Sequence, residues 1–473
     1  MSISPARVAA LRILQRVSED AAWITSLLQA GERDGLSQED RALAYEICLG
    51  VVRWQALLDF QIERLSGRLI AKLDSPVKVI LRMGFYQMAF LDRIPHHAIV
   101  NDSVNLVRKS GKSSASGMVN AVLRKASKAN LKSDGISEIK DSVERLAVET
   151  SHPKWLLNRW LERFGFEDTR SLALSNNQPP SPCFRFVREK AEEAQAWFSS
   201  AGQNLRASEI VPGAWRTTGL SQNSKPVSSG WIYQQDEASQ LVALLARNGL
   251  TGEQRLLDLC AAPGSKTSMI ADGVPPSCLI VASELHSARV ATLKKAVSAY
   301  PNVVVIQCDA ANGMPFASAR PIASGVPIAS GVPIAMDMPI VKDTSGTFDR
   351  ILVDAPCTGL GTLQRHPEIK WRIKEADIAQ LAGLQFRLLE KAASLLKPGG
   401  QLIYSVCSTE EEEGEQVAAK LLENSNFTSI SAEACKAAGI PIEGLRVAGK
   451  GVRTFPHLNA CEGFFLAVFS RTV

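Results

Sequence analysis

Residues 258–267 have the sequence DLCAAPGSKT and follow directly on a short apolar run, 256–259, that predicts a buried strand. The small residues let the backbone approach a ligand closely, and the helix expected next offers free N–H groups to a carboxylate or a phosphate. A plain turn between strand and helix would look similar. The spacing is not that of a P-loop, which disfavours a nucleoside triphosphate. The segment therefore predicts a ligand-binding loop at the carboxyl edge of an open α/β sheet.

The pattern around this loop extends over the C-terminal half of the chain. Apolar runs typical of strands recur, and helical stretches such as 286–299 and 377–396 separate most of them. Buried strands that alternate with helices predict a doubly wound, mostly parallel, Rossmann-like sheet of the α/β class. The predicted strands lie at residues 256–259, 279–282, 303–306, 351–353, 401–406 and 464–469.

Acidic residues follow three of these strands. They are Glu284, Asp309 and Asp354. An acid at the end of the second strand suits the hydroxyls of a ribose. Each acid alone could equally cap a helix. All three together, after a loop of small residues, predict a cofactor that carries a nucleoside and lies along the sheet edge.

The N-terminal third of the chain is basic and has the pattern of a helical bundle. Of the 53 Lys and Arg and the 48 Asp and Glu residues, 18 and 12 lie within 1–130, a net charge of +6. The remaining 35 and 36 give a net charge of −1. Apolar residues recur at helical spacing, as in 77–88, which predicts a compact bundle. The candidate phosphate contacts, for which a solvated surface is the alternative, are Arg108, Lys109, Lys112, Arg124 and Lys125.

The rest of the chain predicts four further segments. Residues 127 to about 149 are polar, and with a helix expected around 155–164 they predict a linker with a helix over 131–170. Residues 171–235 predict a small α+β module. The sheet domain then spans 236–473. Within it, PIASGV at 321–326 repeats at 327–332, and proline every six residues excludes a helix and a central strand. We therefore expect 311–346 to be an inserted low-complexity loop.

Composition excludes several classes of protein. With 45% hydrophobic and 21% charged residues, the 473-residue chain is typical of globular proteins. An odd number of cysteines, nine, predicts reduced thiols and a cytoplasmic location. No apolar stretch is long enough for a membrane helix, and arginines interrupt the first twenty residues, which argues against a signal peptide. No cluster has the spacing of zinc ligands, so we expect no metal.

Two cysteines stand at the same predicted edge as the acids. Cys357 lies in DAPCTG, residues 354–359, and Cys407 lies in YSVCST, residues 404–409. A free cysteine is more often an inert buried residue. Capping-box spacing after Cys407 predicts a helix that begins directly behind it, and a helix N-terminus lowers a thiol pKa. The acidic run 410–413, expected to be a solvated first turn, opposes this shift, and the sequence leaves its sign open.

Three motifs of the chain are similar to those of a known enzyme family. DLCAAPGSKT, DAPCTGLGTLQRHPEIKW and YSVCSTEEEEGE resemble the RNA (cytosine-5) methyltransferases of the Sun/Fmu family. Residues 42–53, 79–105 and 117–125 resemble the NusB-like helical domain of its bacterial small-subunit rRNA members. The resemblance covers nearly the whole chain. It implies a class I methyltransferase sheet domain, S-adenosyl-L-methionine as cofactor, and 16S rRNA, free or partly assembled, as the partner of a monomer.

The resemblance also implies roles for the residues. Cys407 is the nucleophile that adds to carbon 6 of cytosine, and Cys357 assists the release step; their spacing alone does not tell them apart. Asp354 lies beside the cofactor and the cytosine edge, Glu284 binds the ribose, and Asp309 lies near the adenine. The methionine-end loop consists of Cys260, Ala261, Ala262, Pro263, Gly264, Ser265 and Lys266.

The chain departs from the family pattern at two positions. Ser265 stands where the family usually has a second glycine, and Glu284 replaces the more usual aspartate. Residues 453–457, RTFPH, match a late family element near the substrate, with a structural turn as the alternative. Three other functions remain: the same chemistry on tRNA or another RNA, a non-catalytic NusB-like RNA-binding protein, and an amino methyltransferase, which needs no nucleophilic thiol.

Overall fold

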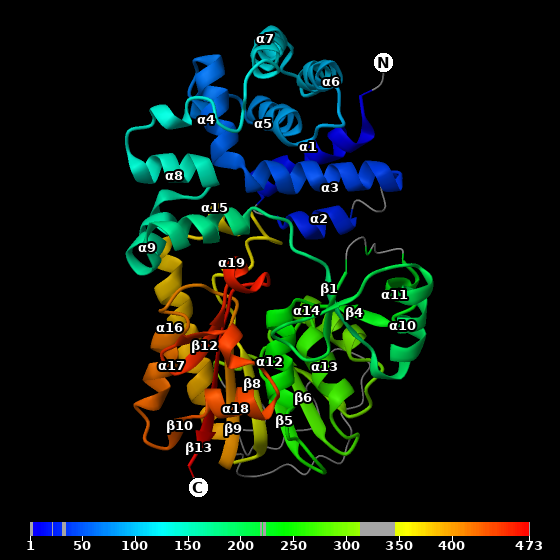
Figure 1. Cartoon of the computed structure of the whole chain (residues 1–473), viewed down its shortest axis with the longest axis vertical. Coiled ribbons are helices and arrows are strands. Elements are labelled where there is room, and N and C mark those ends of the chain that lie inside the picture. The colour runs from blue at the N-terminus through cyan, green and yellow to red at the C-terminus, as the bar shows by residue number, and fades with distance from the viewer. Residues whose placement is uncertain are drawn as a thin grey trace, which may run out of the picture. The chain divides into compact units, whose positions relative to one another are not determined.

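The computed structural model describes residues 3–20, 22–30, 35–217, 220, 224–312 and 346–472. They form two compact units, which are described separately (Figure 1). Unit 1 comprises Met1–Pro179 and Thr362–Glu375, and unit 2 comprises Pro180–Gly361 and Ala376–Val473. Each unit therefore consists of two segments of the chain.

Unit 1 is helical, as predicted for the N-terminal third. The helix α5 contacts α1, α3, α4, α6 and α7, and its sequence is apolar around most of its circumference, which suits a central position. Its Ile80, Leu81 and Phe85 are fully buried. The helices are α1 (Pro5–Glu19), α2 (Ile24–Ala30), α3 (Gln38–Arg53), α4 (Gln55–Ser66), α5 (Ser75–Phe90), α6 (His96–Lys109), α7 (Ser116–Ala126), α8 (Ser142–Thr150), α9 (Lys154–Asn176) and α15 (Ile369–Arg372).

The predicted linker, 131–170, is different in the structure. It contains α8 and most of α9, and it belongs to unit 1. Ile136 and Val148 form a small core with Leu57 of α4, and Trp160 of α9 is 1% exposed. The polar residues that indicated a linker lie on exposed faces, and the apolar residues between them were too sparse to predict the packing.

A second difference concerns residues 362–375, which the sequence analysis placed in the sheet domain. The Lys370 ammonium donates to the carbonyl of Arg53 at 2.9 Å and to Asn177 Oδ1 at 3.0 Å. The Trp371 indole donates to the carbonyl of Val52 at 2.8 Å. Burial, with the nearby Arg53 charge, lowers the pKa of Lys370 well below its usual value. These residues complete unit 1 through hydrogen bonds to distant positions, which no local pattern indicates.

Unit 2 contains the predicted Rossmann-like sheet. Its strand order is β11-β12-β13-β9-β8-β5-β6-β7, with β10 paired to β13. The five strands from β9 to β7 are parallel, and β10 to β13 pair antiparallel. The strands are β5 (Arg255–Asp258), β6 (Leu279–Glu284), β7 (Val303–Gln307), β8 (Phe348–Asp354), β9 (Leu396–Val406), β10 (Phe427–Ser429), β11 (Arg446–Ala448), β12 (Gly451–Thr454) and β13 (Phe464–Arg471).

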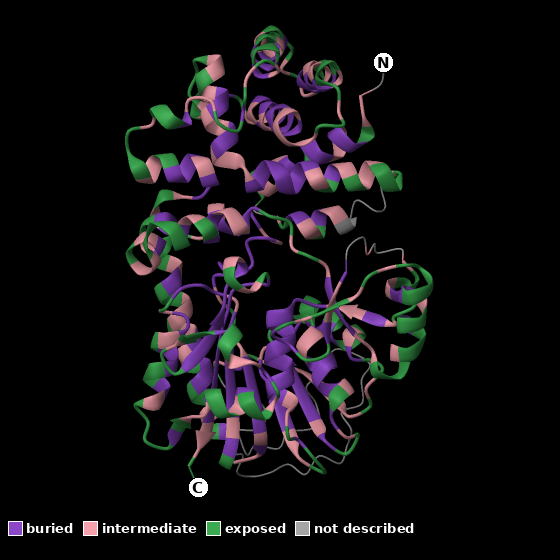
Figure 2. Cartoon of the chain, in the orientation of Figure 1, coloured by how far each residue is buried: buried purple, intermediate pink, exposed green. Residues whose placement is uncertain are grey.

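Both faces of this sheet are buried, and buried residues follow its strands (Figure 2). Leu256 packs into one core cluster and its neighbour Leu257 into another, because successive side chains of a strand point to opposite faces. Helices α12 and α13 contribute to the first cluster and α16 and α17 to the second. The helices are α12 (Glu237–Arg247), α13 (Ser265–Gly273), α14 (Ser287–Ala296), α16 (Glu375–Leu395), α17 (Glu415–Leu422), α18 (Ser431–Ala437) and α19 (Pro456–Asn459).

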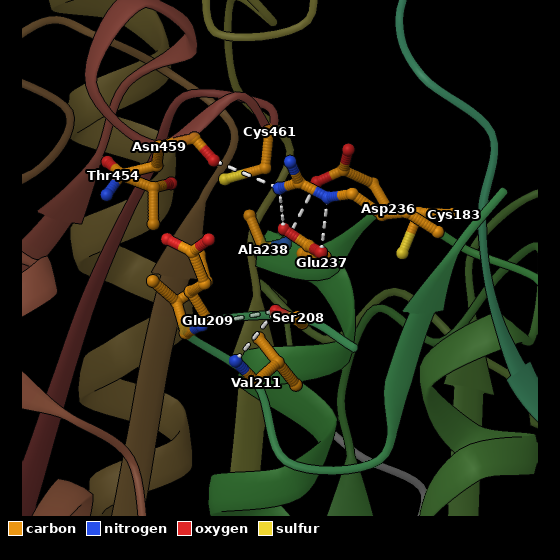
Figure 3. A network of polar contacts seen from close by, with 12 residues as sticks. Cys183, Ser208, Glu209, Val211, Asp236, Glu237, Ala238, Thr454, Asn459 and Cys461 are labelled. Carbon is orange, nitrogen blue, oxygen red and sulfur yellow. Dashed lines mark hydrogen bonds and ion pairs between the residues drawn. The ribbon is translucent and has the colours of Figure 1, made fainter. Parts of the chain in front are cut away.

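The small α+β module also lies in unit 2. Its strands β1 (Cys183–Phe186), β2 (Arg206–Ala207), β3 (Ala214–Arg216) and β4 (Ile232–Gln234) form an antiparallel sheet, with helices α10 (Ala191–Ser200) and α11 (Lys225–Ser228). Arg216 joins it to two helices of unit 2, because it pairs with Glu237 of α12 and donates to the carbonyl of Asn459 of α19 at 3.0 Å. Figure 3 shows Glu237 and Asn459 in this network of polar contacts. Asp236 accepts backbone N–H bonds from Ala238 and Glu462.

The predicted inserted loop, 311–346, lies almost wholly outside the described residues, which leave out 313–345 between β7 and β8. Within the described part of the chain, no helix combines the length and the apolar character that crossing a membrane requires.

Candidate active site

The carboxyl edge of the parallel strands gathers the predicted site residues. In the register of the sheet, Asp258 pairs with Leu352 of β8, and Asp354 pairs with Ser405 of β9. The loop 260–266 therefore begins beside the ends of β8 and β9. Glu284 ends β6, Cys357 follows β8, and Cys407 follows β9. Parallel pairing thus brings residues that are far apart in the sequence to one edge, as predicted.

The loop after β5 is built closely against helix α14. Gly264 has φ of 107°, and a Cβ there would lie 2.8 Å from the Cβ of Ala296. A side chain is therefore excluded by both the backbone conformation and the space. Arg289 of α14 donates to the carbonyl of Ala262 at 2.8 Å and pairs with Glu284, at 3.3 Å. This arginine connects the loop to the acid at the end of β6.

Asp258 is a site residue that the sequence analysis did not single out. Its side chain is buried, and Oδ2 accepts the Thr267 hydroxyl at 2.7 Å. Oδ1 is buried and has no hydrogen-bond partner among the described residues. Burial raises the pKa of Asp258 to about 7. The first letter of DLCAAPGSKT was a possible signal, but a strand end alone does not indicate a buried carboxyl.

The raised pKa of Asp258 predicts that the stability of the protein depends on pH. Because the folded pKa lies above the ordinary 3.8, the folded protein binds more protons than the unfolded chain between about pH 4 and 7. The free energy of unfolding should therefore fall as pH rises through this range, by up to roughly 4 kcal/mol. Denaturant titrations of cofactor-free wild type and Asp258→Asn should show this fall in wild type only. Parallel pH profiles of the two proteins would contradict the prediction.

Lys266 and Asp354 form an ion pair in which Nζ lies 2.7 Å from Oδ2. Burial acts to lower the pKa of Lys266, but the Asp354 carboxylate outweighs it and the pKa is raised. Ser405 of β9 donates to Asp354 Oδ1 at 2.7 Å. The Asp354 carboxylate is thus held from both sides, and the predicted loop and the predicted acid are in direct contact.

Glu284 and Asp309 differ in their surroundings. Glu284 is 4% exposed and accepts the His286 N–H at 3.0 Å. Asp309 is exposed and accepts from the N–H of Ala311 at 3.1 Å and from Asn312 Nδ2 at 2.8 Å. Asp309 therefore stabilises the turn after β7. The contact of Asp309 with an adenine stays a prediction.

The two predicted cysteines lie side by side. The Sγ atoms of Cys357 and Cys407 are 3.2 Å apart, and both residues are half-buried. The contact with Cys407 and burial together raise the pKa of Cys357 well above its usual value. Cys357 therefore keeps its proton at neutral pH and can donate it in a hydrogen bond to a neighbouring sulfur.

The helix predicted directly behind Cys407 is absent from this position, and that prediction is wrong. α17 begins only at Glu415, and Glu410 and Glu413, which we expected in a solvated first turn, are 3% and 0% exposed. The intervening residues form a turn instead, because Ser408 accepts the Glu410 N–H rather than that of Glu411. Cys407 therefore does not lie at a helix N-terminus.

Glu413 connects the two cysteine loops. Its carboxylate accepts the N–H of Thr358 at 2.8 Å, the Ser408 hydroxyl at 2.5 Å and Gln385 Nε2 at 3.0 Å. Thr358 follows Cys357 and Ser408 follows Cys407, so one carboxylate fixes both loops. Burial raises the pKa of Glu413. The role of Glu413 could not be predicted from the sequence, because four consecutive glutamates indicate a solvated surface.

Arg453 supports the same loop from β12. It is 1% exposed, donates to the carbonyls of Ser408 at 2.6 Å and Glu410 at 2.8 Å, and pairs with Glu415 at 2.5 Å. Arg453 thus has a structural role in β12, and the position of residues 453–457 near the substrate stays a prediction. Within the described residues, no group of three or more His, Cys, Asp and Glu side chains could hold a metal ion.

Gly361 fixes the backbone of Cys407 and yields a stability prediction. Its N–H donates to the Cys407 carbonyl at 3.0 Å, and a Cβ at 361 would lie 1.8 Å from the carbonyl oxygen of Gly463. Gly361→Ala should therefore lower the free energy of unfolding by about 1–3 kcal/mol. Gly383→Ala in α16 is the matched control: it has room for a Cβ and should stabilise the helix, by up to ~1 kcal/mol. Equal urea midpoints for both variants would contradict the prediction.

Comparisons with known proteins give matches for both the N-terminal and the C-terminal region of the chain. The family model described as 16S rRNA methyltransferase RsmB/F matches residues 245–319 and 324–470, and the NusB family model matches 4–128. The chain is 31% identical to the probable ribosomal RNA small subunit methyltransferase B of Synechocystis sp., over 98% of each protein. It is 31% identical to ribosomal RNA small subunit methyltransferase B of Pseudomonas putida, over 87% of each.

Solved structures support the fold. The structure titled PH0851 has a TM-score of 0.76 at 24% identity and covers all of both chains. A methyltransferase homolog protein from Pyrococcus horikoshii has a TM-score of 0.55 at 24% identity, covering 70% of this chain and all of the other.

Proposed function

Because the chain belongs to the RsmB/F family of 16S rRNA methyltransferases, we propose that it transfers a methyl group from S-adenosyl-L-methionine to carbon 5 of a cytosine in 16S rRNA. The observation that carries the proposal is the thiol pair, Cys357 and Cys407, 3.2 Å apart beside the carboxyl edge of the sheet. Cytosine carbon 5 is a poor nucleophile until a thiolate adds to carbon 6. Transfer to a nitrogen needs no such thiol, so the pair favours carbon 5.

The carboxyl edge fits the proposed cofactor. The loop 260–266 would hold the methionine end, because Gly264 leaves no side chain there and Asp258 Oδ1 is a buried acceptor that no described group satisfies. Glu284 would accept the hydroxyls of the ribose, and Asp309 would lie near the adenine. When bound, S-adenosyl-L-methionine supplies an electrophilic methyl group.

The reaction uses the two sulfurs in sequence. The Cys407 thiolate forms a bond to carbon 6 of an unpaired or flipped-out cytosine, which makes carbon 5 nucleophilic. Asp354, held by Lys266 and Ser405, accepts a hydrogen bond from the exocyclic amino group at the cytosine edge and so orients the base for attack. After methyl transfer, water accepts the proton of carbon 5, the electron pair re-forms the double bond between carbons 5 and 6, and the bond between carbon 6 and the Cys407 sulfur breaks. The protonated Cys357 donates a hydrogen bond to the departing sulfur.

Incubating the protein with radiolabelled S-adenosyl-L-methionine and either 16S rRNA or total tRNA tests the proposal. Nucleoside analysis of the product should give labelled 5-methylcytosine from 16S rRNA. Label in tRNA alone would support the same chemistry on the alternative substrate, and label in a methylated amino group of a base would contradict the proposed position. Label in neither RNA would contradict the proposed function.

A further inference from the structure

A groove in unit 1 is not used by the reaction described above. It has a volume of about 700 Å³ and is lined by residues of α6 and α7 and by Ser127 and Lys128, which directly follow α7. The two helices pack on each other and on α5. They bury Ile99 and Leu106 of α6, and Val119 and Leu123 of α7. Their other faces, which carry the groove, remain accessible.

The groove is positively charged and polar. Its lining contains Arg108, Arg124 and Lys128 and no carboxylate. No described carboxylate forms an ion pair with any of these three cations. The neighbouring acid on α6, Asp102, is buried and pairs with Arg7 at 2.7 Å, so it does not neutralise the groove. The groove therefore suits an extended anion.

The remaining polar lining consists of groups that can contact bases. The amides of Asn101, Asn105 and Asn120 can donate to and accept from base edges, and the imidazoles of His96 and His97 can stack on bases. Only two aliphatic side chains, those of Val100 and Val104, line the groove, whereas a protein partner would need an apolar central contact.

We propose that this groove binds a single-stranded segment of RNA, with phosphates at Arg108, Arg124 and Lys128 and bases against the amides and imidazoles. The inference rests on RNA being the substrate, as proposed above, and it names the surface of unit 1 that holds this RNA. A duplex would turn its base edges inward, so the base-contacting groups favour a single strand.

The five basic residues that were predicted as phosphate contacts have different surroundings in the structure. Arg108 and Arg124 line the groove. Lys112 instead pairs with Asp74 at 3.1 Å, and the Lys125 ammonium donates to the carbonyl of Leu65 at 3.2 Å. Lys109 is exposed but does not line the groove. Loss of a groove cation should therefore weaken RNA binding more than loss of Lys109.

A substitution at Gly117 should change the groove without changing the fold. It lines the groove in the first turn of α7, and a Cβ there would meet nothing within 4 Å. Gly117→Glu places a carboxylate among the three cations, in a turn where the helix dipole favours an acid. Gly117→Ala is the control for the added Cβ. Lys140→Glu, at an exposed position of unit 1 outside the groove, is a charge-reversal control.

The test measures binding of full-length protein to an unstructured RNA oligonucleotide and to a hairpin of the same length. Gly117→Glu should raise the Kd for the oligonucleotide at least 10-fold, and Gly117→Ala and Lys140→Glu should change it less than about 2-fold. Arg124→Ala and Lys128→Ala should each lower the slope of log K against log salt by about 0.7, the value for one phosphate contact on a single strand.

Methylation assays with 16S rRNA separate this inference from the proposed function. Gly117→Glu should raise KM and leave kcat at saturating RNA within about 2-fold. If wild type methylates RNA but the groove variants bind the oligonucleotide as tightly as wild type, the groove inference is overturned and the proposed function stands. If wild type methylates no RNA, the proposed function fails, and the binding data alone decide about the groove. If wild type binds the hairpin with the same affinity as the unstructured oligonucleotide, the proposed preference for a single strand is overturned.

Discussion

Replacement of Cys407 by alanine should lower the rate of methyl transfer to 16S rRNA by about 10⁴-fold or more. This is the order of loss seen when a covalent nucleophile is removed, because cofactor and RNA still bind but carbon 5 is no longer activated. The measurement is incorporation of labelled methyl groups at saturating RNA. Cys435→Ala is the matched control, since this cysteine of α18 is buried in the core of unit 2 and is not part of the thiol pair.

The fate of the RNA gives a second readout for the same variant. RNA that contains 5-fluorocytosine cannot lose a proton from carbon 5, so the covalent intermediate should accumulate on wild type and on Cys435→Ala. Denaturing gels should show this adduct for both proteins and not for Cys407→Ala. Normal turnover by Cys407→Ala, or an adduct on it, would refute its assignment as the nucleophile.

Replacement of Cys357 by alanine should have the opposite effect on the adduct. The protonated Cys357 thiol lies 3.2 Å from the Cys407 sulfur, and its loss removes the hydrogen-bond donor that assists the departure of that sulfur. We expect one methyl transfer per protein and then a stalled adduct on ordinary RNA, with steady-state turnover lowered by about 10²–10⁴-fold.

Quantifying the denaturant-stable protein–RNA complex against time checks this expectation. The double variant Cys357→Ala, Cys407→Ala is the control and should form none. If Cys407→Ala accumulates the adduct on ordinary RNA and Cys357→Ala does not, the roles of the two cysteines are reversed.

The fold could be predicted because its determinants are local and periodic. Buried strands such as 256–259 and 351–353 are short apolar runs, and parallel pairing then fixes which loops meet at the carboxyl edge. Five of the six predicted strands lie within strands of the parallel sheet or overlap them, and 464–469 lies within β13. That pairing also brought Cys357 and Cys407 together, although their roles come only from the family resemblance.

The parts that could not be predicted depend on partners far away in the sequence. A glutamate in a run of four is ordinarily exposed, and only the hydroxyls and amides of Thr358, Ser408 and Gln385 make a buried position for Glu413 possible. The same holds for Lys370, whose ammonium is buried because it meets the Arg53 carbonyl and Asn177. Periodicity describes how an element faces the core, and it carries no information about such polar partners.

The insertion of residues 362–375 into unit 1 has a consequence for how the chain is made. Synthesis proceeds from the N-terminus, so a ribosome that has released residues 1–179 has exposed a helical domain without its last helical turn, α15. The Arg53 carbonyl and Asn177 meet Lys370 only after almost two hundred further residues have been added. The N-terminal domain can therefore complete its hydrogen bonds only after most of the sheet domain has been synthesised. The two domains should finish folding together in the cell.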